Sequence, residues 1–277
     1  MKKIRIGTSG YSFQDWRGAF YPQDIKTGEM LNYYQTIFDT VEINSTYYNI
    51  PNRAVFYHLD KKTGEDFQFV VKTHKNVTHK RSGNPDDLKK VMDELLTSIE
   101  PLIKSGKLAG LLAQFPFSFK LNSQSLTYLK ALKQCSEEFP LFTEFRHESW
   151  LRDDIHEFLR ENGVGYVNVD EPQLPGLMPP QEIVTTDKGY VRFHGRNAES
   201  WWHSSPEGKE SGHTSRYDYI YSELELTEWA NRIIRILKFV DVIYVFFNNC
   251  VKGQAVTNAL YLKGVLEKLI KGQVFVK

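Results

Sequence analysis

The sequence predicts one α/β domain over residues 1–277, a (β/α)8 barrel of parallel strands. Eight apolar segments of strand length alternate with helical segments, and this alternation is typical of a parallel sheet. The chain length is close to the roughly 250 residues of a typical single barrel. No glycine-rich dinucleotide or phosphate motif follows any strand, so an open doubly wound sheet is the less favoured architecture.

The first half of the chain supplies four strand–helix units. Strands are expected at residues 4–7, 40–46, 67–74 and 108–115. Helices are expected at residues 29–38, between Asn52 and residue 64, and from Asn84 onward. Asn84 caps the third of these helices and Pro85 suits its first position. Pro101 is expected to kink or end that helix.

The second half repeats the pattern with one exception. Helices are expected at residues 123–138, 151–163, 222–237 and 254–270, and strands within residues 141–150 and at 165–170, 190–195 and 242–249. A capping box formed by Ser222 and Glu225 begins the seventh helix. Four prolines follow the sixth strand, so the sixth helix is predicted to be weak or missing; they are Pro172, Pro175, Pro179 and Pro180.

Most of the predicted strands begin apolar and end polar, with the polar residues two positions apart. Side chains two apart on a strand share a face. Inward side chains at the carboxyl ends of barrel strands form the active face. The residues expected to meet there are Glu42, Asn44, Lys72, His74, Glu144, Arg146, Asn168, Asp170, Arg192, His194 and Asn248.

Three interpretations of this cluster are open. The charges could form a structural salt-bridge network, although apolar packing would stabilise a barrel as well. The carboxylates with His74, His147 and His194 could bind a divalent metal, although the interleaved arginines compete for the same carboxylates. In the favoured interpretation, arginine and lysine bind an anionic substrate while a carboxylate moves a proton.

The sequence therefore predicts an enzyme, a hydrolase or lyase acting on a phosphorylated or nucleotide-like substrate. The candidate catalytic residues are Glu42, Glu144, Asp170 and His194. The candidate substrate-binding residues are Asn44, Lys72, His74, Arg146, Arg192 and Asn248, with Trp16 and Tyr47 from aromatic loops that could stack on bases or sugars. An anion site is expected on Arg146 and Arg192. The alternatives are a non-catalytic barrel that binds nucleic acid or another ligand, and a metal-dependent hydrolase; no metal ligands are assigned, and a divalent metal is a candidate cofactor.

The long polar connection at residues 196–221 is predicted to be a mobile lid over this face. Connections of this length are unusual unless they have such a role. Trp201 and Trp202 lie within it, and large aromatic residues in a polar loop favour a covering function.

The composition of the chain limits the classes of binding partner and the cellular location that can be expected. The net charge of +1 gives no global attraction to nucleic acid or membranes. Cys135 and Cys250 fit no metal or redox spacing and are expected to be free thiols in a reducing compartment. No signal region and no apolar run near the roughly 20 residues of a membrane span are found. A cytoplasmic protein without a membrane partner is expected, and an anionic small molecule or nucleic acid is the expected class of partner.

Several motifs are distributed over nearly the whole chain: Gly7-Thr8-Ser9-Gly10-Tyr11-Ser12 with Trp16, Phe20-Tyr21-Pro22, Val41-Glu42-Ile43-Asn44-Ser45-Thr46-Tyr47-Tyr48, Glu144-Phe145-Arg146-His147 with Ser149-Trp150, Arg192-Phe193-His194-Gly195, and Val245-Phe246-Phe247-Asn248-Asn249 with Gly253. Together they resemble the YecE-like family, domain of unknown function 72. The resemblance implies a TIM-like barrel and no assigned reaction. Glu148 stands where the family commonly has proline, and Cys250 where an aspartate is common, which removes a carboxylate from the end of the last strand.

Overall fold

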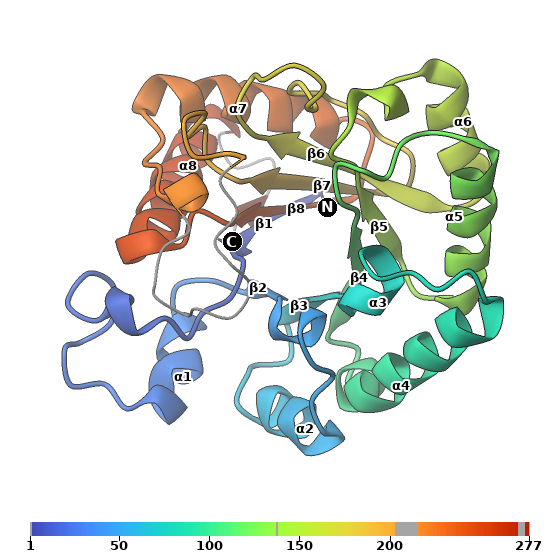
Figure 1. Ribbon diagram of the computed structural model, residues 1–277. Helices are drawn as coiled ribbons and strands as arrows, with labels where there is room; N and C mark the ends of the chain where they lie inside the picture. The colour runs from blue at the N-terminus through green and yellow to red at the C-terminus, as the bar shows by residue number, and fades with distance from the viewer. Residues whose placement is uncertain (1, 137, 203–214, 271–274, 277) are drawn as a thin grey trace.

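Eight parallel strands form a nearly closed barrel in the computed structural model, which describes residues 2–136, 138–202, 215–270 and 275–276 (Figure 1). The sheet order is β2-β3-β4-β5-β6-β7-β8-β1-β9. The barrel strands are β1 (Lys3–Thr8), β2 (Thr40–Ile43), β3 (Gln68–Lys72), β4 (Leu108–Gln114), β5 (Leu141–Glu144), β6 (Val164–Asp170), β7 (Lys188–Phe193) and β8 (Val242–Phe247). The TIM-like (β/α)8 barrel predicted from the sequence is confirmed.

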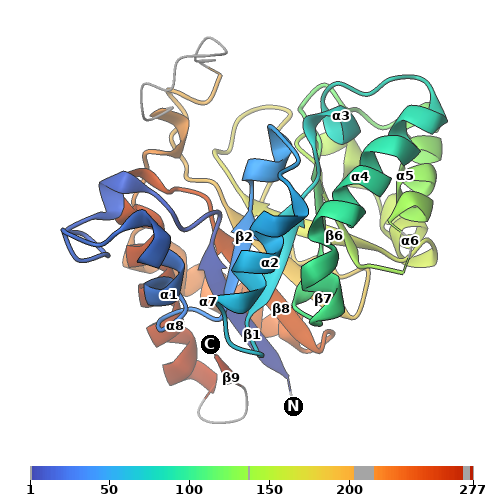
Figure 2. The same cartoon turned by 90° about the horizontal axis from the view of Figure 1, so that it is seen from below.

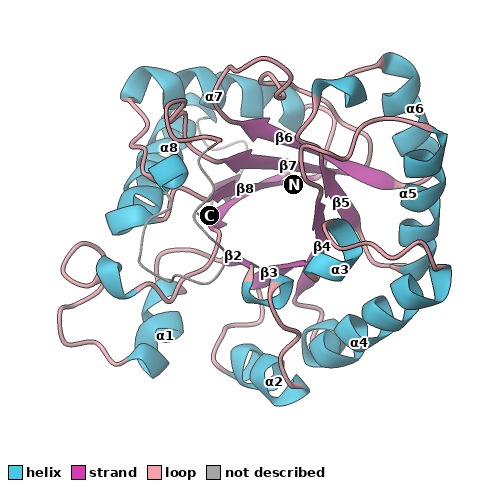
Figure 3. Ribbon diagram, in the orientation of Figure 1, coloured by secondary structure: helices cyan, strands magenta, loops and turns pink. Residues whose placement is uncertain are grey.

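Helices surround the barrel on its outer side (Figure 3). They are α1 (Met30–Tyr34), α2 (Arg53–Lys61), α3 (Lys75–Thr78), α4 (Pro85–Lys104), α5 (Ser123–Cys135), α6 (Asp153–Glu161), α7 (Glu223–Leu237) and α8 (Gln254–Ile270). Of these, the short helix α3 lies beyond the carboxyl ends of the strands (Figure 2). None of these helices, within the part of the chain that the structure describes, is long and apolar enough to cross a membrane.

No helix connects β6 to β7 across residues 171–187, all of which are described, so the prediction of a weak or missing helix is confirmed. The connection covers the outer side of β6 instead. The Asn168 amide holds it there, donating to the Ile183 carbonyl at 3.0 Å and accepting from the Ile183 N–H at 2.8 Å. Asn168 consequently faces the outer layer and not the barrel interior.

The seam between β1 and β2 closes only near its carboxyl end. A single parallel bridge joins Ser9 to Glu42 there, and the N–H of Gly10 donates to the Glu42 carbonyl at 2.8 Å. Gly7 permits the approach, because a Cβ at this position would lie 2.3 Å from the Thr40 carbonyl oxygen. At the other end of β1, the short strand β9 (Phe275–Val276) pairs with it close to the N-terminus (Figure 2).

An aromatic layer fills the barrel below the charged strand ends. The Phe142 ring lies 4.9 Å from that of Tyr190, and the Tyr190 and Tyr244 rings are 6.5 Å apart. Glycines on both neighbouring strands make room for Phe142, since a Cβ at Gly110 or Gly165 would lie 2.7 or 2.6 Å from its ring. The polar groups at the strand ends therefore lie directly above this packed aromatic layer.

Several boundaries differ from the sequence-based expectation. The second and fifth strands end earlier, at Ile43 and Glu144, and the seventh begins and ends two residues earlier. Pro101 lies inside α4, which continues to Lys104. Buried neighbours Ile99 and Leu102 hold this last turn against the core despite the missing N–H donor. The helix α3 and the strand β9 were not predicted.

Candidate active site

Arg192 lies at the centre of a buried ionic network inside the barrel. Its Nη2 is 2.6 Å from Glu42 Oε1 and its Nη1 is 2.5 Å from Glu144 Oε2. All three residues are 0% exposed. The Tyr190 hydroxyl donates to the second Glu42 oxygen at 2.6 Å. The convergence of Glu42, Glu144 and Arg192 at the strand ends agrees with the placement expected from the sequence.

Arg146 extends this network from the segment that follows β5. Its Nε lies 2.6 Å from Glu144 Oε1, and its Nη1 lies 2.7 Å from Glu171 Oε2. Its Nη2 lies 3.0 Å from His194 Nε2. Both arginines predicted to receive a substrate anion therefore already bind carboxylates of the protein.

Glu144 is held as a carboxylate. Burial by itself raises its pKa, but Arg146, Arg192 and His194 together bring the pKa well below its usual range. Burial also raises the energy of a charged imidazole and, with Arg146, lowers the pKa of His194 to about 3. The Asn248 amide nitrogen lies 3.1 Å from His194 Nδ1. The Nε2 of His194 lies 3.1 Å from Glu144 Oε1 and 3.0 Å from Arg146 Nη2.

Glu171 belongs to the network but was not among the predicted site residues. It directly follows β6, is 0% exposed, and accepts the backbone N–H of Met178 at 3.0 Å. Burial raises its pKa to about 7, against the lowering effect of Arg146. The sequence signal that could have found it is its position one residue after Asp170, on the opposite face of an extended chain.

Asp170 lies outside the network, contrary to the placement expected from the sequence. It faces the outer layer, where it accepts from Arg196 Nε at 2.9 Å and Nη2 at 2.7 Å. The Tyr221 hydroxyl and the Trp229 indole N–H donate to it at 2.7 and 2.6 Å. The inward-facing residues at the end of β6 are displaced by one position from those expected, so Glu171 and not Asp170 reaches the network.

Lys72 ends β3 beside the same network, but it is bound differently from the arginines. Its Nζ donates to the neutral Gln114 Oε1 at 2.8 Å and lies 4.6 Å from the centre of the Tyr47 ring. Among the described residues it forms no ion pair, and its side chain is only partly buried. Burial, and next the Arg192 charge, lower its pKa to about 7, although Glu144 and Glu42 act in the opposite direction.

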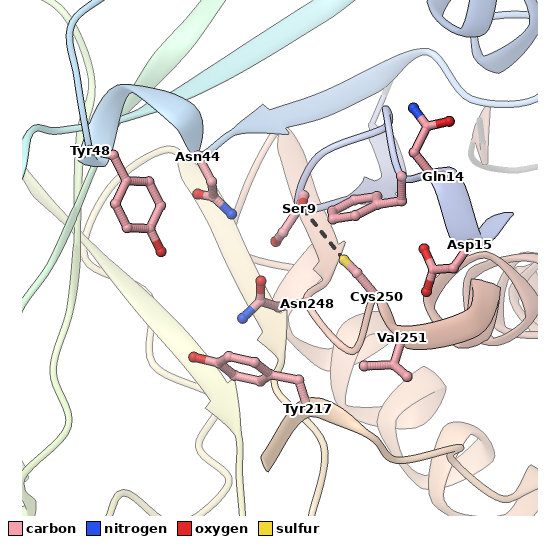
Figure 4. A pocket seen from close by; sticks show the side chains of 10 residues that line it. Ser9, Gln14, Asp15, Asn44, Tyr48, Tyr217, Asn248, Cys250 and Val251 are labelled. Atoms are coloured by element: carbon pink, nitrogen blue, oxygen red, sulfur yellow. Dashed lines mark hydrogen bonds between the residues drawn. The ribbon is translucent and has the colours of Figure 1, made fainter. Parts of the chain in front are cut away.

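A pocket of about 510 Å³ opens beside the network. Figure 4 shows Asn44, Asn248, Tyr48 and Tyr217 around one space. The remaining lining residues are Ser9, Phe13, Gln14, Asp15, Cys250 and Val251. Two contacts link pocket and network: Ser9 Oγ lies 3.5 Å from Arg192 Nη2, and Asn248 contacts His194. The buried Asn44 Oδ1 has no hydrogen-bond partner among the described residues, so it is available to a ligand donor.

The Cys250 thiol also faces this pocket, and it is not activated. Its Sγ lies 3.5 Å from the Ser9 carbonyl oxygen, as the dashed line in Figure 4 shows. Burial raises the pKa of this thiol, with a further contribution from Glu42. A buried thiol of this kind is inert as a nucleophile.

Both ends of the long connection at 196–221 lie over the mouth. The Trp201 ring centre is 5.7 Å from the Arg146 guanidinium and 5.9 Å from that of Arg216. The Tyr217 ring lies 6.3 Å from the imidazole of His194. Residues 203–214 of the predicted lid lie outside the described residues, and its mobility stays a prediction.

Two predicted ligand-binding residues have structural contacts instead. Trp16 is 0% exposed and donates its indole N–H to the Cys250 carbonyl at 2.6 Å. His74 caps α3, with Nδ1 accepting the Asn76 N–H at 3.3 Å. Neither residue lines the pocket beside the network.

The histidines considered for a metal do not converge. His147 accepts the Ser149 N–H at 3.0 Å, whereas His194 lies in the ionic network. Within the described ranges, no group of three His, Cys, Asp or Glu side chains could hold a metal ion. The donor set at the mouth therefore gives the metal interpretation no support.

Comparisons with known proteins agree with this architecture. Residues 5–274 match the family described as protein of unknown function DUF72. The chain is 32% identical over 272 residues to the UPF0759 protein YunF of Bacillus subtilis (strain 168), covering 95% of each chain. A DUF72 family structure from Thermotoga maritima MSB8 has a TM-score of 0.86 and 45% identity, covering 96% of this chain and 99% of that one.

A second DUF72 family structure, from Enterococcus faecalis V583, has a TM-score of 0.80 and 28% identity and covers 95% of both chains. The resemblance found in the sequence motifs is thus confirmed over nearly the whole length. This chain belongs to the DUF72 family.

Proposed function

We propose that this protein is an enzyme that binds a small anionic substrate, phosphorylated or nucleotide-like, at the carboxyl end of the barrel. Lys72 carries the proposal, since it is the mouth cation whose nitrogen contacts a neutral amide while the neighbouring arginines bind carboxylates. A substrate anion can pair with Lys72 without displacing any of the protein's own ion pairs. The predicted anion site is accordingly moved from Arg146 and Arg192 to this residue.

The rim adds a second cation and aromatic surfaces. The Arg216 guanidinium lies 5.4 Å from the centre of the Tyr217 ring, and it forms no ion pair within the described part of the chain. Tyr48 is 71% exposed and lines the pocket with Tyr217. Rings that line a pocket close to a cation are suited to stack on the bases or sugars of an anionic ligand.

The mouth also contains groups that can transfer a proton at neutral pH. Burial disfavours the charged form of each group, so it lowers the pKa of Lys72 and raises the pKa of Glu171, both to about 7. Perturbed pKa values of this kind are typical of catalytic groups. Glu42 and Glu144 then hold the arginines in place and set the charge around Lys72, in place of the proton-transfer role predicted for them.

A second candidate is a ligand-binding barrel without catalysis. It is favoured by the pairing of all three carboxylates in the network, Glu42, Glu144 and Glu171, with an arginine. In this alternative the same mouth cations and rings bind the ligand, but no bond of the ligand changes.

The test is calorimetric titration of phosphate and of adenosine monophosphate into the protein, its Lys72→Met and Lys72→Arg variants, and Lys80→Met as an exposed-lysine control. Losing the charge that pairs with the anion should weaken binding at least about tenfold in Lys72→Met, whereas Lys80→Met should bind like the parent. Unchanged affinity in Lys72→Met would contradict the proposal.

Catalysis is tested separately with a panel of phosphate esters and nucleotides, followed by product formation. Turnover that is lost in Lys72→Arg while binding persists would support the enzyme. Binding without turnover of any compound would favour the ligand-binding alternative.

A further inference from the structure

We propose that Lys72 is a nucleophile that forms an imine with the carbonyl carbon of an anionic aldehyde or ketone bound at the mouth. The inference rests on the proposed function and names carbonyl compounds as the substrate class of the same site.

The contrast with Lys107 shows what is unusual about Lys72. Lys107 is buried, at 6% exposed, whereas Lys72 is partly buried, and the Nζ of Lys107 has a full set of partners. It lies 2.9 Å from Asp60 Oδ1 and donates to the carbonyls of Asp60 and Thr63 at 2.7 and 2.9 Å. These contacts hold the Lys107 nitrogen in one place, so Lys107 is structural.

The Nζ of Lys72 has no comparable set of acceptors among the described residues. The acceptor of its Nζ is one neutral amide oxygen, that of Gln114, and the face of the Tyr47 ring lies on another side. The carboxylates that could have paired with it, Glu42 and Glu144, bind Arg192. A lysine that is desolvated beside other cations is favoured as the neutral amine, which is the form that attacks carbonyl carbon.

The fixed charges suit the product as well as the amine. A protonated imine on Lys72 has the same charge as the ammonium, and Glu144 and Glu42 are close enough to favour that charge. An anionic group elsewhere on the carbonyl compound would be attracted to the rim cation Arg216, which stacks on Trp201 and Tyr217. For such a compound the rim would retain the anionic group, and Lys72, the cation that pairs with simple anions such as phosphate, would be left free to react.

The chemical step is balanced without any oxidant or reductant. The Lys72 nitrogen forms a bond to the carbonyl carbon, and the carbonyl oxygen takes up a proton to give a carbinolamine. Loss of the two amine hydrogens with that oxygen as one water molecule leaves a C=N double bond.

The experiment is reductive trapping of the full chain at pH 7 with glyoxylate, a small anionic aldehyde, and cyanoborohydride. Intact mass and peptide mapping then locate the adducts, and acetaldehyde serves as the neutral comparison. A lysine of ordinary pKa near 10.4 is almost wholly protonated at pH 7, so Lys72 should be modified at least about tenfold faster than the other lysines. The preference should be weaker with acetaldehyde, and Lys72→Arg should lose the fast adduct.

Labelling spread over exposed lysines, with Lys72 no faster than they are, would overturn the imine. Measuring the binding of phosphate and adenosine monophosphate separates a failure of the imine proposal from a failure of the anion site. If Lys72 is unmodified but Lys72→Met still loses anion binding, the imine is refuted and the anion site stands. If Lys72 is modified rapidly while anion binding does not depend on it, the imine is supported and the assignment of Lys72 as the anion-binding cation is refuted.

Discussion

Asp170 and Glu144 are two buried carboxylates that each end a strand of the barrel, but their surroundings differ. Asp170 faces outward and is saturated by donors from Arg196, Tyr221 and Trp229. Glu144 faces inward and shares its arginines with other carboxylates of the network. Both are matched, so a satisfied buried carboxylate does not by itself mark a site.

The difference lies in the groups around each carboxylate. The donors to Asp170 attach the start of the long connection, at Arg196, to the body of the barrel and to α7. Beside Glu144, Lys72 is left without a carboxylate and Glu171 has a pKa of about 7. The reactive candidate beside Glu144 is therefore Lys72, the cation that remains without a carboxylate partner among the described residues once the arginines have formed their ion pairs.

Removing the central arginine of the inner network should have the largest effect. Arg192→Met leaves Glu42 and Glu144 buried without their shared partner, and breaking a buried pair typically costs about 3–5 kcal/mol. Urea unfolding measures the loss. Arg232→Met, which removes a more exposed pair with Glu182, should cost less than about 1 kcal/mol. Equal losses in the two variants would contradict the buried network.

A substitution at Asp170, which faces the outer layer, should cost less stability than Arg192→Met and should leave anion binding unchanged. Asp170→Asn keeps the shape but removes the charge that Arg196 pairs with, so we expect a loss of about 1.5–3 kcal/mol in the free energy of unfolding. Anion binding measured by calorimetry should remain within about twofold of the parent. A larger loss of binding would mean that Asp170 acts on the mouth after all.

The raised pKa of Glu171 predicts a distinctive pH dependence of the free energy of unfolding. Its folded pKa of about 7 exceeds the ordinary glutamate value of 4.5, so the folded state binds the extra proton between these values. The contribution of Glu171 is therefore fully present below about 4.5 and is lost as the pH rises through about 7. Glu171→Gln should flatten the fall in unfolding free energy over this window. A profile with the same slope in both proteins would refute the raised pKa.

The smallest effect is expected at the ring beside Lys72. Tyr47→Leu removes a cation–π contact that contributes about 0.5–1 kcal/mol, so anion affinity should fall about two- to fivefold. Calorimetry with phosphate measures this. Stability should change little, because Tyr47 is only partly buried. Tighter binding in the variant would indicate that the ring obstructs the anion.

The sequence was sufficient for the architecture because strand–helix alternation and the four prolines after β6 report on local backbone preferences. It was also sufficient to bring Glu42, Glu144, Arg146, Arg192 and His194 together, since alternate residues of a strand share a face. The strand ends were harder. A displacement of one residue exchanges the faces of a strand, and this error put Asp170 in the place of Glu171.

The pairing of charges could not be predicted from the sequence. Which arginine binds which carboxylate depends on strand register across the barrel, and Glu42 and Arg192 are 150 residues apart. Lys72 was expected as one of several cations, but its lack of a carboxylate follows only from the three-dimensional competition. Trp16 and His74 were likewise assigned to a site by residue type, whereas their contacts are with nearby backbone.

The central claim is that Lys72 remains a reactive, unpaired amine at the mouth. The most direct measurement is the NMR titration of Lys72 in protein labelled with ¹³C-lysine, assigned with Lys72→Arg and repeated with phosphate. The account predicts a midpoint near the pKa of about 7, and an upward shift with phosphate because a bound anion favours the ammonium. A midpoint near the ordinary lysine value of about 10.4, unchanged by phosphate, would contradict it.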